Sequence, residues 1–405
     1  MVPIRLLVVH HVLCFIITGI IIVPGMICCS ARAEVYTVNT ANELKTTLAI
    51  CESNLEDDVI NIEPGLYSLT EPLSYDPAAQ EEDYSITLRS TTDAQVILDG
   101  SNGTQVLSFR TYTSNGHVTL KHLTLTNGFV TSPDQGAGGW IWVHNAHILI
   151  QDCVFDDNRA SALYQGTNAA GLFVKIGSSG RIDIRRSLFK DNYAKGIGGG
   201  AYFNIGFGGT VNLVNNIFHS NEATTQGAGF YLSMITGSIT LTNNTLTRNN
   251  NSAGNGYGGG GCYISCYYDT VTCNIYNNII WGNQSASGLG QDIYLKTNND
   301  PLSAGATVKV FNNSFSNMEI TVSDNLTQGN NIDSDPLFVL DDPLSQLIDP
   351  HIQTDSPCID AALSSAPLCP ALDFDQDRRF ARPDMGADEI ESIPITAPTL
   401  NLLLF

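Results

Sequence analysis

Four residues suited to acid–base chemistry occupy matching places in a repeated sequence phrase: Asp157, Lys190, Asp191 and His219. If equivalent positions of successive repeats stack, two carboxylates and two bases lie within about two strand spacings of one another. A lyase that acts on acidic sugars needs a base beside the sugar carboxylate and a cation, or calcium, to neutralise that carboxylate. The alternative is an ordinary charged turn, because charged rims prevent stacked strands from associating laterally.

A second set of carboxylates has the spacing of positions 1, 3, 5 and 12 of a calcium-binding loop: Asp373, Asp375, Asp377 and Asp384. Arg378 stands where such a loop requires glycine, and its last ligand is Asp in place of Glu. Calcium is therefore the one cofactor that the sequence suggests. The alternative is a salt-bridged segment in which Arg378 or Arg379 pairs with these acids.

Two tryptophans are the candidate ligand-binding residues. Trp140 and Trp142 flank Ile141, and Val143 follows. If Ile141 and Val143 face a core, both indoles face outward and can stack on sugar rings, whereas the opposite register buries them. We favour the outward register, which suits adhesion to a glycan or to a protein.

These candidates lie in or beside a phrase that recurs seven times, marked by an apolar residue: Leu125, Phe155, Phe189, Phe218, Leu246, Ile280 and Phe315. Successive marks are 28 to 35 residues apart. Apolar residues seven and five positions before each mark alternate with other residues, which is typical of a strand with one buried face. A period near 30 with a strand in each copy predicts a solenoid of stacked coils.

Asparagine identifies the kind of coil. The later copies carry it two positions before the mark: Asn216, Asn244, Asn278 and Asn313. The preceding residue in these copies is also Asn, and such a pair suits a sharp corner because Asn tolerates the left-handed conformation. Stacked about 4.8 Å apart, the amides can form a ladder of hydrogen bonds. We therefore predict an all-β, single-stranded parallel β-helix, right-handed because such connections are right-handed in about 98% of cases.

The chain divides into four predicted segments. Residues 1–33 have the charge, apolar run and Ala31-Arg32-Ala33 ending of a signal peptide, although an uncleaved membrane anchor is the alternative. Residues 34–330 are assigned to the β-helix, and a short helix after Thr40 is expected to cover its first coil. Residues 331–391 are expected to form a loop-rich C-terminal cap, followed by a tail over 392–405.

The charge of the chain bears on its binding partners, and its cysteines bear on disulfide bonds. Asp and Glu number 40 against 19 Lys and Arg, giving a net charge of −21, which argues against nucleic acid and anionic lipid as partners. Seven cysteines remain after residue 33, so they cannot all pair within one chain. Cys358 and Cys369 close a short loop and are the predicted disulfide. Two of a second group could also pair: Cys262, Cys266 and Cys273.

Two stretches resemble known families. The Gly-Gly-x-aromatic and Phe-x-x-Asn signals, such as Phe189 to Asn192, resemble the repeats of bacterial polymorphic outer-membrane proteins. The tail Ser-Pro-Cys-Ile-Asp-Ala, followed by Asp-x-Asp and Asp-Met-Gly-Ala-x-Glu, resembles the bacterial choice-of-anchor cap of right-handed parallel β-helix proteins. The resemblance implies a secreted or surface-displayed protein of the pectate-lyase-like superfold, usually without an assigned activity.

We therefore expect an exported, non-catalytic protein, secreted or on the cell surface, that presents a binding surface to an extracellular glycan or a surface protein. Contact with a membrane is expected only through the signal segment or a missing C-terminal anchor. The alternative is a polysaccharide lyase or another glycan-active enzyme, because the fold hosts such enzymes but does not by itself establish activity.

Overall fold

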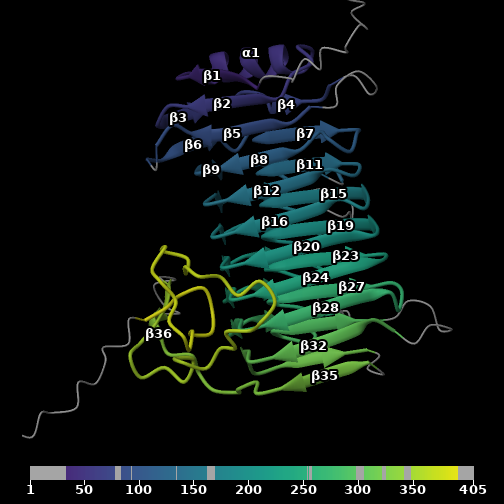
Figure 1. The fold of residues 1–405 in the computed structure, drawn as a ribbon, viewed down its shortest axis with the longest axis vertical. Helices are drawn as coiled ribbons and strands as arrows, with labels where there is room; N and C mark the ends of the chain where they lie inside the picture. The colour runs from purple at the N-terminus through teal and green to yellow at the C-terminus, as the bar shows by residue number, and fades with distance from the viewer. Residues whose placement is uncertain are drawn as a thin grey trace, which may run out of the picture. The chain divides into compact units, whose positions relative to one another are not determined.

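The computed structural model describes residues 33–77, 84–92, 94–133, 135–161, 169–252, 254, 258–297, 305–321, 325–341 and 348–390. The predicted signal peptide up to Arg32 and the tail over 392–405 lie outside these residues. From Ala33 onward the chain forms one compact unit. Within it the strands stack as a parallel β-helix of about seven turns (Figure 1). The described residues include no helix that is long and apolar enough to cross a membrane.

Sheet A is the longest face of the β-helix. It contains β1 (Glu34–Val38), β2 (Asp58–Ile62), β5 (Ile86–Ser90), β8 (Val118–Lys121), β12 (His147–Gln151), β16 (Arg181–Arg185), β20 (Gly209–Val214), β24 (Gly237–Thr242), β28 (Val271–Tyr276), β32 (Thr307–Phe311) and β35 (Leu326–Gly329). Neighbouring strands pair in parallel without a shift, so that Val211 lies between Ile182 and Ile239. Side chains of one kind therefore form columns across the coils.

Sheet B follows sheet A in each coil and holds the apolar marks. It contains β3 (Gly65–Ser68), β6 (Val96–Asp99), β9 (Leu123–Thr126), β13 (Val154–Asp156), β17 (Leu188–Lys190), β21 (Ile217–His219), β25 (Thr245–Thr247), β29 (Ile279–Trp281) and β33 (Ser314–Phe315). Phe155, Phe189 and Phe218 are fully buried and stack with ring centroids 4.6 and 4.4 Å apart. The repeat register read from the sequence is thus confirmed.

Sheets C and D complete each coil. Sheet C contains β4 (Leu73–Tyr75), β7 (Leu107–Thr111), β11 (Gly139–Val143), β15 (Leu172–Ser178), β19 (Ala201–Phe207), β23 (Phe230–Met234), β27 (Cys262–Cys266), β31 (Ile293–Lys296) and β34 (Met318–Ile320). Sheet D contains β10 (Phe129–Val130), β14 (Arg159–Ala160), β18 (Tyr193–Ala194), β22 (Glu222–Ala223), β26 (Asn250–Asn251) and β30 (Gln284–Ser285). Apolar residues from sheets A, B and C fill a common core.

The predicted asparagine ladder is present at the corner between sheets A and B. Asn216 donates from Nδ2 to Asn244 Oδ1 at 3.0 Å, and the same contact continues from Asn244 to Asn278 at 3.0 Å. Asn278 donates to Asn313 at 2.9 Å. The residue before each of these has a left-handed backbone, with φ between 54° and 59° at the four positions Asn215, Asn243, Asn277 and Asn312. The Asn pair therefore makes the corner as expected.

A second ladder runs between sheets B and D. In five of the seven copies the residue three places past the mark is a buried Asn, which donates to its equivalent in the next coil, as Asn192 does to Asn221 at 2.9 Å and Asn221 to Asn249 at 2.9 Å. Asn283 ends the series by donating to the buried Asp292 carboxylate at 3.0 Å. Both ladders satisfy polar groups inside the coil, where an unpaired donor would cost about 1–3 kcal/mol.

The predicted helix α1 (Ala41–Cys51) covers the first coils (Figure 1). Thr40 is its N-cap and accepts a hydrogen bond from the Glu43 N–H at 3.2 Å. Leu44 and Leu48 are fully buried on the face that contacts β2 and β4. The helix thus shields apolar core residues at the amino-terminal end of the β-helix.

The chain after β35 forms a loop-rich cap with one antiparallel pair, β36 (Phe338–Asp341) and β37 (Ile348–Ile352). The cap lies along the Asn corner between sheets A and B, shown in yellow in Figure 1. Four corner amides donate to cap carbonyls: Asn215 to Leu372, Asn243 to Asp384, Asn277 to Leu363 and Asn312 to Ala361. The cap is thereby bound to the side of four successive coils.

Candidate functional site

Trp140 and Trp142 lie on the outer face of sheet C. Ile141 and Val143 are fully buried in the common core, and the two indoles alternate with them on β11 and are half-buried. The outward register is therefore confirmed. Their ring centroids are 6.4 Å apart, so the two indoles form one aromatic surface.

Two cations contact this aromatic surface. The Arg110 guanidinium on β7 lies 5.2 Å from the Trp140 ring centroid and 4.9 Å from that of Trp142. Lys175 on β15 places its Nζ 5.6 Å from the Trp142 ring. Arg110 also donates to the Tyr112 hydroxyl at 2.9 Å. Guanidinium and ammonium groups over indole faces are attracted by about 0.5–2 kcal/mol each, which holds these side chains in place.

Asp76 forms an ion pair with this group, with its carboxylate 3.4 Å from Arg110 Nη1. The Arg110 and Asp76 side chains are 33% and 45% exposed, so water screens this ion pair. Within the described part of the chain, the indole N–H groups of Trp140 and Trp142 have no hydrogen-bond acceptor. We call the group of Arg110, Tyr112, Trp140, Trp142 and Lys175 the tryptophan face.

An aromatic column continues from Trp140 along the outer face of sheet C, and the sequence analysis missed it. Its members pair in register through five further strands: Phe173, Tyr202, Tyr231, Tyr263 and Tyr294. Successive rings lie 4.7 to 5.2 Å apart. The signal was an aromatic residue at the second position of nearly every glycine-led strand. Turns pass close to this column, for example Gly198 beside Tyr202, while Trp140 at its end and Tyr231 are only partly buried.

The structure brings together most of the predicted acid–base residues at the outer edge of sheet B, which we call the rim: Asp157, Lys190, Asp191 and His219. Asp156, Lys190 and His219 are neighbours in one column, as the repeat register required. Lys190 Nζ lies 2.9 Å from the Asp156 carboxylate and 3.4 Å from that of Asp191. Partial burial lowers the pKa of Lys190, but the Asp156 and Asp191 carboxylates together outweigh it and the pKa is raised. Lys190 is therefore a protonated cation and not a free base.

His219 and Asp157 differ in their surroundings. The His219 ring is only 8% exposed, and burial, with the charges of Lys190 and Arg248, lowers its pKa to about 4. Its Nδ1 lies 3.2 Å from the Ser220 hydroxyl. Asp157 is exposed in the left-handed turn that precedes the second ladder. The rim therefore contains one neutral imidazole beside a compensated cation.

A polar cavity of about 380 Å³ lies next to this rim. Its lining includes two carboxylates and a guanidinium together with amide and hydroxyl groups: Asp191, Ser220, Asn221, Glu222, Arg248, Asn250, Gly282 and Gln284. Arg248 forms an ion pair with Asp341 of the cap. Such a lining can hydrogen-bond a sugar or another polar ligand.

The four carboxylates of the calcium pattern do not converge on one point. Asp373 accepts hydrogen bonds from the Asp377 and Glu389 N–H groups at 2.8 and 3.0 Å. Asp384 accepts from the Asp360 and Ile390 N–H groups at 2.7 and 2.8 Å. Burial is the main cause that raises the pKa of Asp384 to about 6. Both side chains are buried and hold cap loops together, while Asp375 faces His351.

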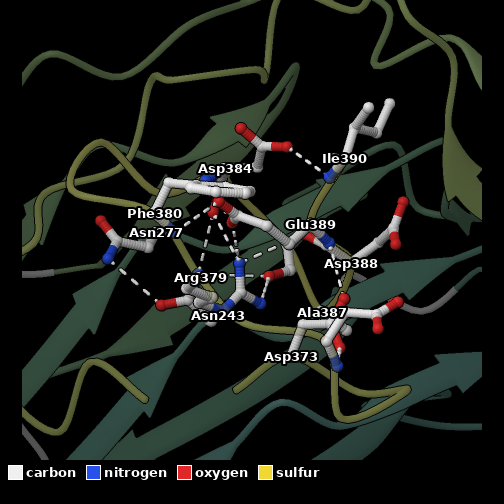
Figure 2. Close-up of polar contacts among 12 residues, drawn as sticks. Asn243, Asn277, Asp373, Arg379, Phe380, Asp384, Ala387, Asp388, Glu389 and Ile390 are labelled. Atoms are coloured by element: carbon white, nitrogen blue, oxygen red, sulfur yellow. Dashed lines mark hydrogen bonds and ion pairs between the residues drawn. The ribbon is translucent and has the colours of Figure 1, made fainter. Parts of the chain in front are cut away.

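Arg379 is the centre of the cap, but its ion-pair partner among the described residues is Glu389 and not an acid of the calcium pattern, as the salt-bridged alternative had expected. Figure 2 shows its guanidinium beside the Glu389 carboxylate, and Nη1 donates to Glu389 Oε2 at 2.9 Å. Both side chains are 2% exposed. Arg379 also donates to Asn215 Oδ1 at 3.0 Å and to the Gly386 carbonyl at 2.8 Å. This buried ion pair therefore joins the cap to a corner of the β-helix.

A further cluster in the cap was not predicted as a group. His351 Nε2 lies 2.7 Å from Asp375 Oδ2, and its Nδ1 contacts Asp349 Oδ1. The Asp375 carboxylate is the main cause that raises the pKa of His351 to about 10. Asp388 lies beside them and accepts a hydrogen bond from the Ile352 N–H at 3.0 Å. Only Asp375 of this group belonged to a sequence pattern.

The predicted disulfide between Cys358 and Cys369 is not formed in this structure, where all the described cysteines are free thiols. Cys358 is fully buried, and its thiol interacts with the hydroxyls of Ser356 and Ser314. Cys369 is half-buried and lines a different cavity beside Arg185 and Arg186. Burial raises the pKa of Cys358 to about 11, which favours an unreactive thiol.

No family model matches the sequence, and a search of curated proteins finds no significant match.

Proposed function

We propose that this protein is an exported, non-catalytic β-helix protein that binds an acidic polysaccharide through the tryptophan face. The observation that supports it is the placement of Arg110 and Lys175 against the outward indoles of Trp140 and Trp142. A sugar ring stacks on an indole through its C–H groups, while a uronic carboxylate pairs with a nearby cation. A face with both features suits a sugar polymer that carries carboxylates.

Charge distribution supports an anionic glycan more than a protein partner at this face. The chain has a net charge of −21, so a polyanion is repelled by most of the surface. Arg110 and Lys175 place two positive charges on this face, and among the described residues only Arg110 has an ion-pair partner, Asp76 at 3.4 Å. The two cations confer selectivity for carboxylated over neutral sugars, and binding should weaken as salt screens them.

Binding of soluble polygalacturonate, measured by calorimetry, tests this proposal. Trp142→Ala is expected to weaken binding about tenfold, because it removes the ring that contacts both cations, a loss of about 1.4 kcal/mol. Lys175→Gln should weaken binding to polygalacturonate but not to a neutral galactan. Phe207→Ala is the matched control, because Phe207 is 58% exposed on a strand of the same sheet and should have no effect.

Equal affinity of wild type and Trp142→Ala would contradict the proposal, as would the absence of binding to any glycan. If a protein partner were instead captured in a Trp142-dependent manner without glycan binding, the face would be a protein-adhesion surface and our choice of glycan would be wrong.

The alternative function is a glycan-active enzyme, and the polar cavity beside His219 favours it. A neutral imidazole near carboxylates and Arg248 resembles the set that proton abstraction beside a sugar carboxylate requires. The same polygalacturonate samples, with and without calcium, can be followed by the ultraviolet absorbance of unsaturated ends. We expect no such absorbance. Turnover that is lost in His219→Gln would establish the enzymatic alternative.

We also infer a relationship to the bacterial β-helix proteins with a choice-of-anchor cap, and hence secretion or display at the cell surface. This inference is supported by the tail from Ser356 to Glu389, while the Phe-x-x-Asn repeats resemble those of bacterial polymorphic outer-membrane proteins. The buried roles of Asp373, Asp384 and Glu389 give a physical reason for the tail motif. Fractionation of cells that express the full chain tests the location.

A further inference from the structure

Three segments of the cap bring an imidazole and carboxylates together. His351 belongs to the end of β37, Asp375 to the turn after Asp373, and Asp388 to the segment that carries Glu389. One possible ligand atom from each of His351, Asp375 and Asp388 lies within 4.8 Å of the others. Atoms bound to one zinc ion lie about 3 to 4 Å apart, since each is about 2.0–2.2 Å from the ion, so small side-chain rotations suffice.

A fourth side chain orients the imidazole. Asp349 contacts His351 Nδ1, and Nε2 faces Asp375. In protein metal sites, the ring nitrogen that does not bind the ion commonly donates to a carboxylate, which fixes the orientation and tautomer of the ring. Asp349 is placed for that role. Asp388 is positioned separately, because one of its oxygens accepts from the Ile352 N–H at 3.0 Å.

The charge of this cluster points to a cation. Three carboxylates surround a single imidazole, and among the described residues no Lys or Arg forms an ion pair with them. By contrast, the His147–Asp183 contact elsewhere in the chain is compensated by Arg181 and Arg185. A bound divalent ion would supply positive charge at the centre of the three carboxylates.

We propose that His351, Asp375 and Asp388 bind one divalent transition-metal ion, with Asp349 as the positioning residue behind the imidazole. One imidazole nitrogen with carboxylate oxygens suits zinc or manganese, whereas calcium prefers six to eight oxygen ligands. The site differs from the calcium pattern, since Asp373 and Asp384 are committed to backbone N–H groups. The ion would connect three cap segments that are distant in sequence.

Calorimetry of the full, untagged chain with zinc chloride, manganese chloride and calcium chloride tests the site. We expect one zinc or manganese ion per chain, with at least tenfold weaker binding in His351→Gln and in Asp375→Asn. Asp375 is 45% exposed, so its substitution is the one least able to disturb folding. His144→Gln is the matched control, because it removes an exposed imidazole elsewhere and should leave binding unchanged.

Cobalt absorption provides a second readout. Cobalt bound to the wild type should give visible absorption bands that change in His351→Gln and remain in His144→Gln. The proposal is overturned if neither zinc nor manganese binds, or if their binding is unchanged in both His351→Gln and Asp375→Asn. Binding of calcium alone, independent of His351, would also overturn it.

Discussion

His219 shows how a titratable side chain is made neutral by its position in a coil. The ring lies between the equivalent positions of Lys190 and Thr247, and it is almost fully buried. Protonation would place a charge near Lys190 and Arg248 in a site that water hardly reaches, which is why its pKa falls to about 4. The free energy of unfolding should therefore depend on pH through this side chain.

The folded protein should lose stability through His219 as the pH falls from about 6.5 to about 4. In this range the unfolded state binds the proton and the folded state does not, so stability is fully present above pH 6.5. Between pH 7.5 and pH 5 the loss is about 2 kcal/mol. Urea unfolding of wild type and His219→Gln at both pH values measures it. An equal loss in the variant would show that His219 is not responsible.

Single-residue predictions from the sequence succeeded where alternation with the core decides the outcome. Trp140 and Trp142 face outward because Ile141 and Val143 occupy the core. The burial of His219 was not predictable, because it depends on neighbours in adjacent coils. The His351 cluster was likewise hidden, since its members are separated by up to 39 residues, from Asp349 to Asp388, and lie in no repeat.

At the level of elements, each Asn pair divides two tasks between adjacent residues. Asn244 points into the coil, where its Oδ1 accepts from the Asn216 N–H at 2.9 Å and from Asn216 Nδ2 at 3.0 Å. Asn243 has a left-handed backbone, and its amide donates to the Asp384 and Gly386 carbonyls of the cap at 3.0 and 3.2 Å. Asn244 therefore supports the β-helix, and Asn243 mainly supports the cap while also accepting from Asn277 Nδ2 in the next coil at 3.2 Å.

Substitution should separate these two tasks. Asn244→Ala leaves two buried Asn216 donors without their acceptor and should destabilise the β-helix by at least about 2 kcal/mol. Asn243→Gly keeps the left-handed backbone without strain and should accelerate hydrogen exchange mainly in the cap. Exchange mass spectrometry of both variants measures the effect. Equal protection of cap and coils in both would contradict the division.

Repetition explains which elements the sequence could predict. Seven copies of one phrase determine the strands, the coil register and the ladder through Asn216, because each copy confirms the others. The Asn column past each mark was visible, yet its role as a second ladder needed the coil geometry. Its end at Asp292 could not be foreseen, because Asp292 is not part of the repeat.

At the scale of the whole molecule, one buried ion pair contributes to the attachment of the cap to the β-helix. Arg379 and Glu389 are paired inside the cap, and Arg379 also reaches Asn215 on the coil corner. Glu389 accepts from the Phe380 and Asp384 N–H groups at 3.0 and 2.8 Å. Removing one partner leaves the other as a buried, uncompensated charge, which commonly costs about 3–5 kcal/mol.

Arg379→Met should therefore release the cap while the coils stay folded. We expect cap segments to become protease-sensitive, whereas the core around Phe218 keeps its protection from hydrogen exchange. Arg379→Met combined with Glu389→Gln removes both charges and should recover part of the loss. Limited proteolysis with mass spectrometry follows the release. Loss of protection throughout the coils would instead show that the cap is required for the whole fold.

The position of the cap was beyond the sequence analysis. A loop-rich terminal segment was predicted from composition, but its docking along a corner depends on backbone carbonyls such as those of Leu363 and Asp384. Carbonyl groups are common to all residues, so no residue type reveals such contacts in advance. Within the repeats, the surface that binds the cap is marked in the sequence by the first Asn of each pair: Asn215, Asn243, Asn277 and Asn312.

The cap is hydrogen-bonded to four consecutive corners, from Asn215 to Asn312. This contact restricts where coils can be added to the chain or removed from it. A whole coil inserted or deleted between α1 and that corner leaves every described hydrogen bond to the cap intact. The same change between Asn215 and Asn312 would shift the corner Asn residues that bind the cap by one coil relative to their partners in the cap. We therefore expect the number of coils to vary on the amino-terminal side of Asn215. The number of coils between Asn215 and Asn312 is fixed by their hydrogen bonds to the cap.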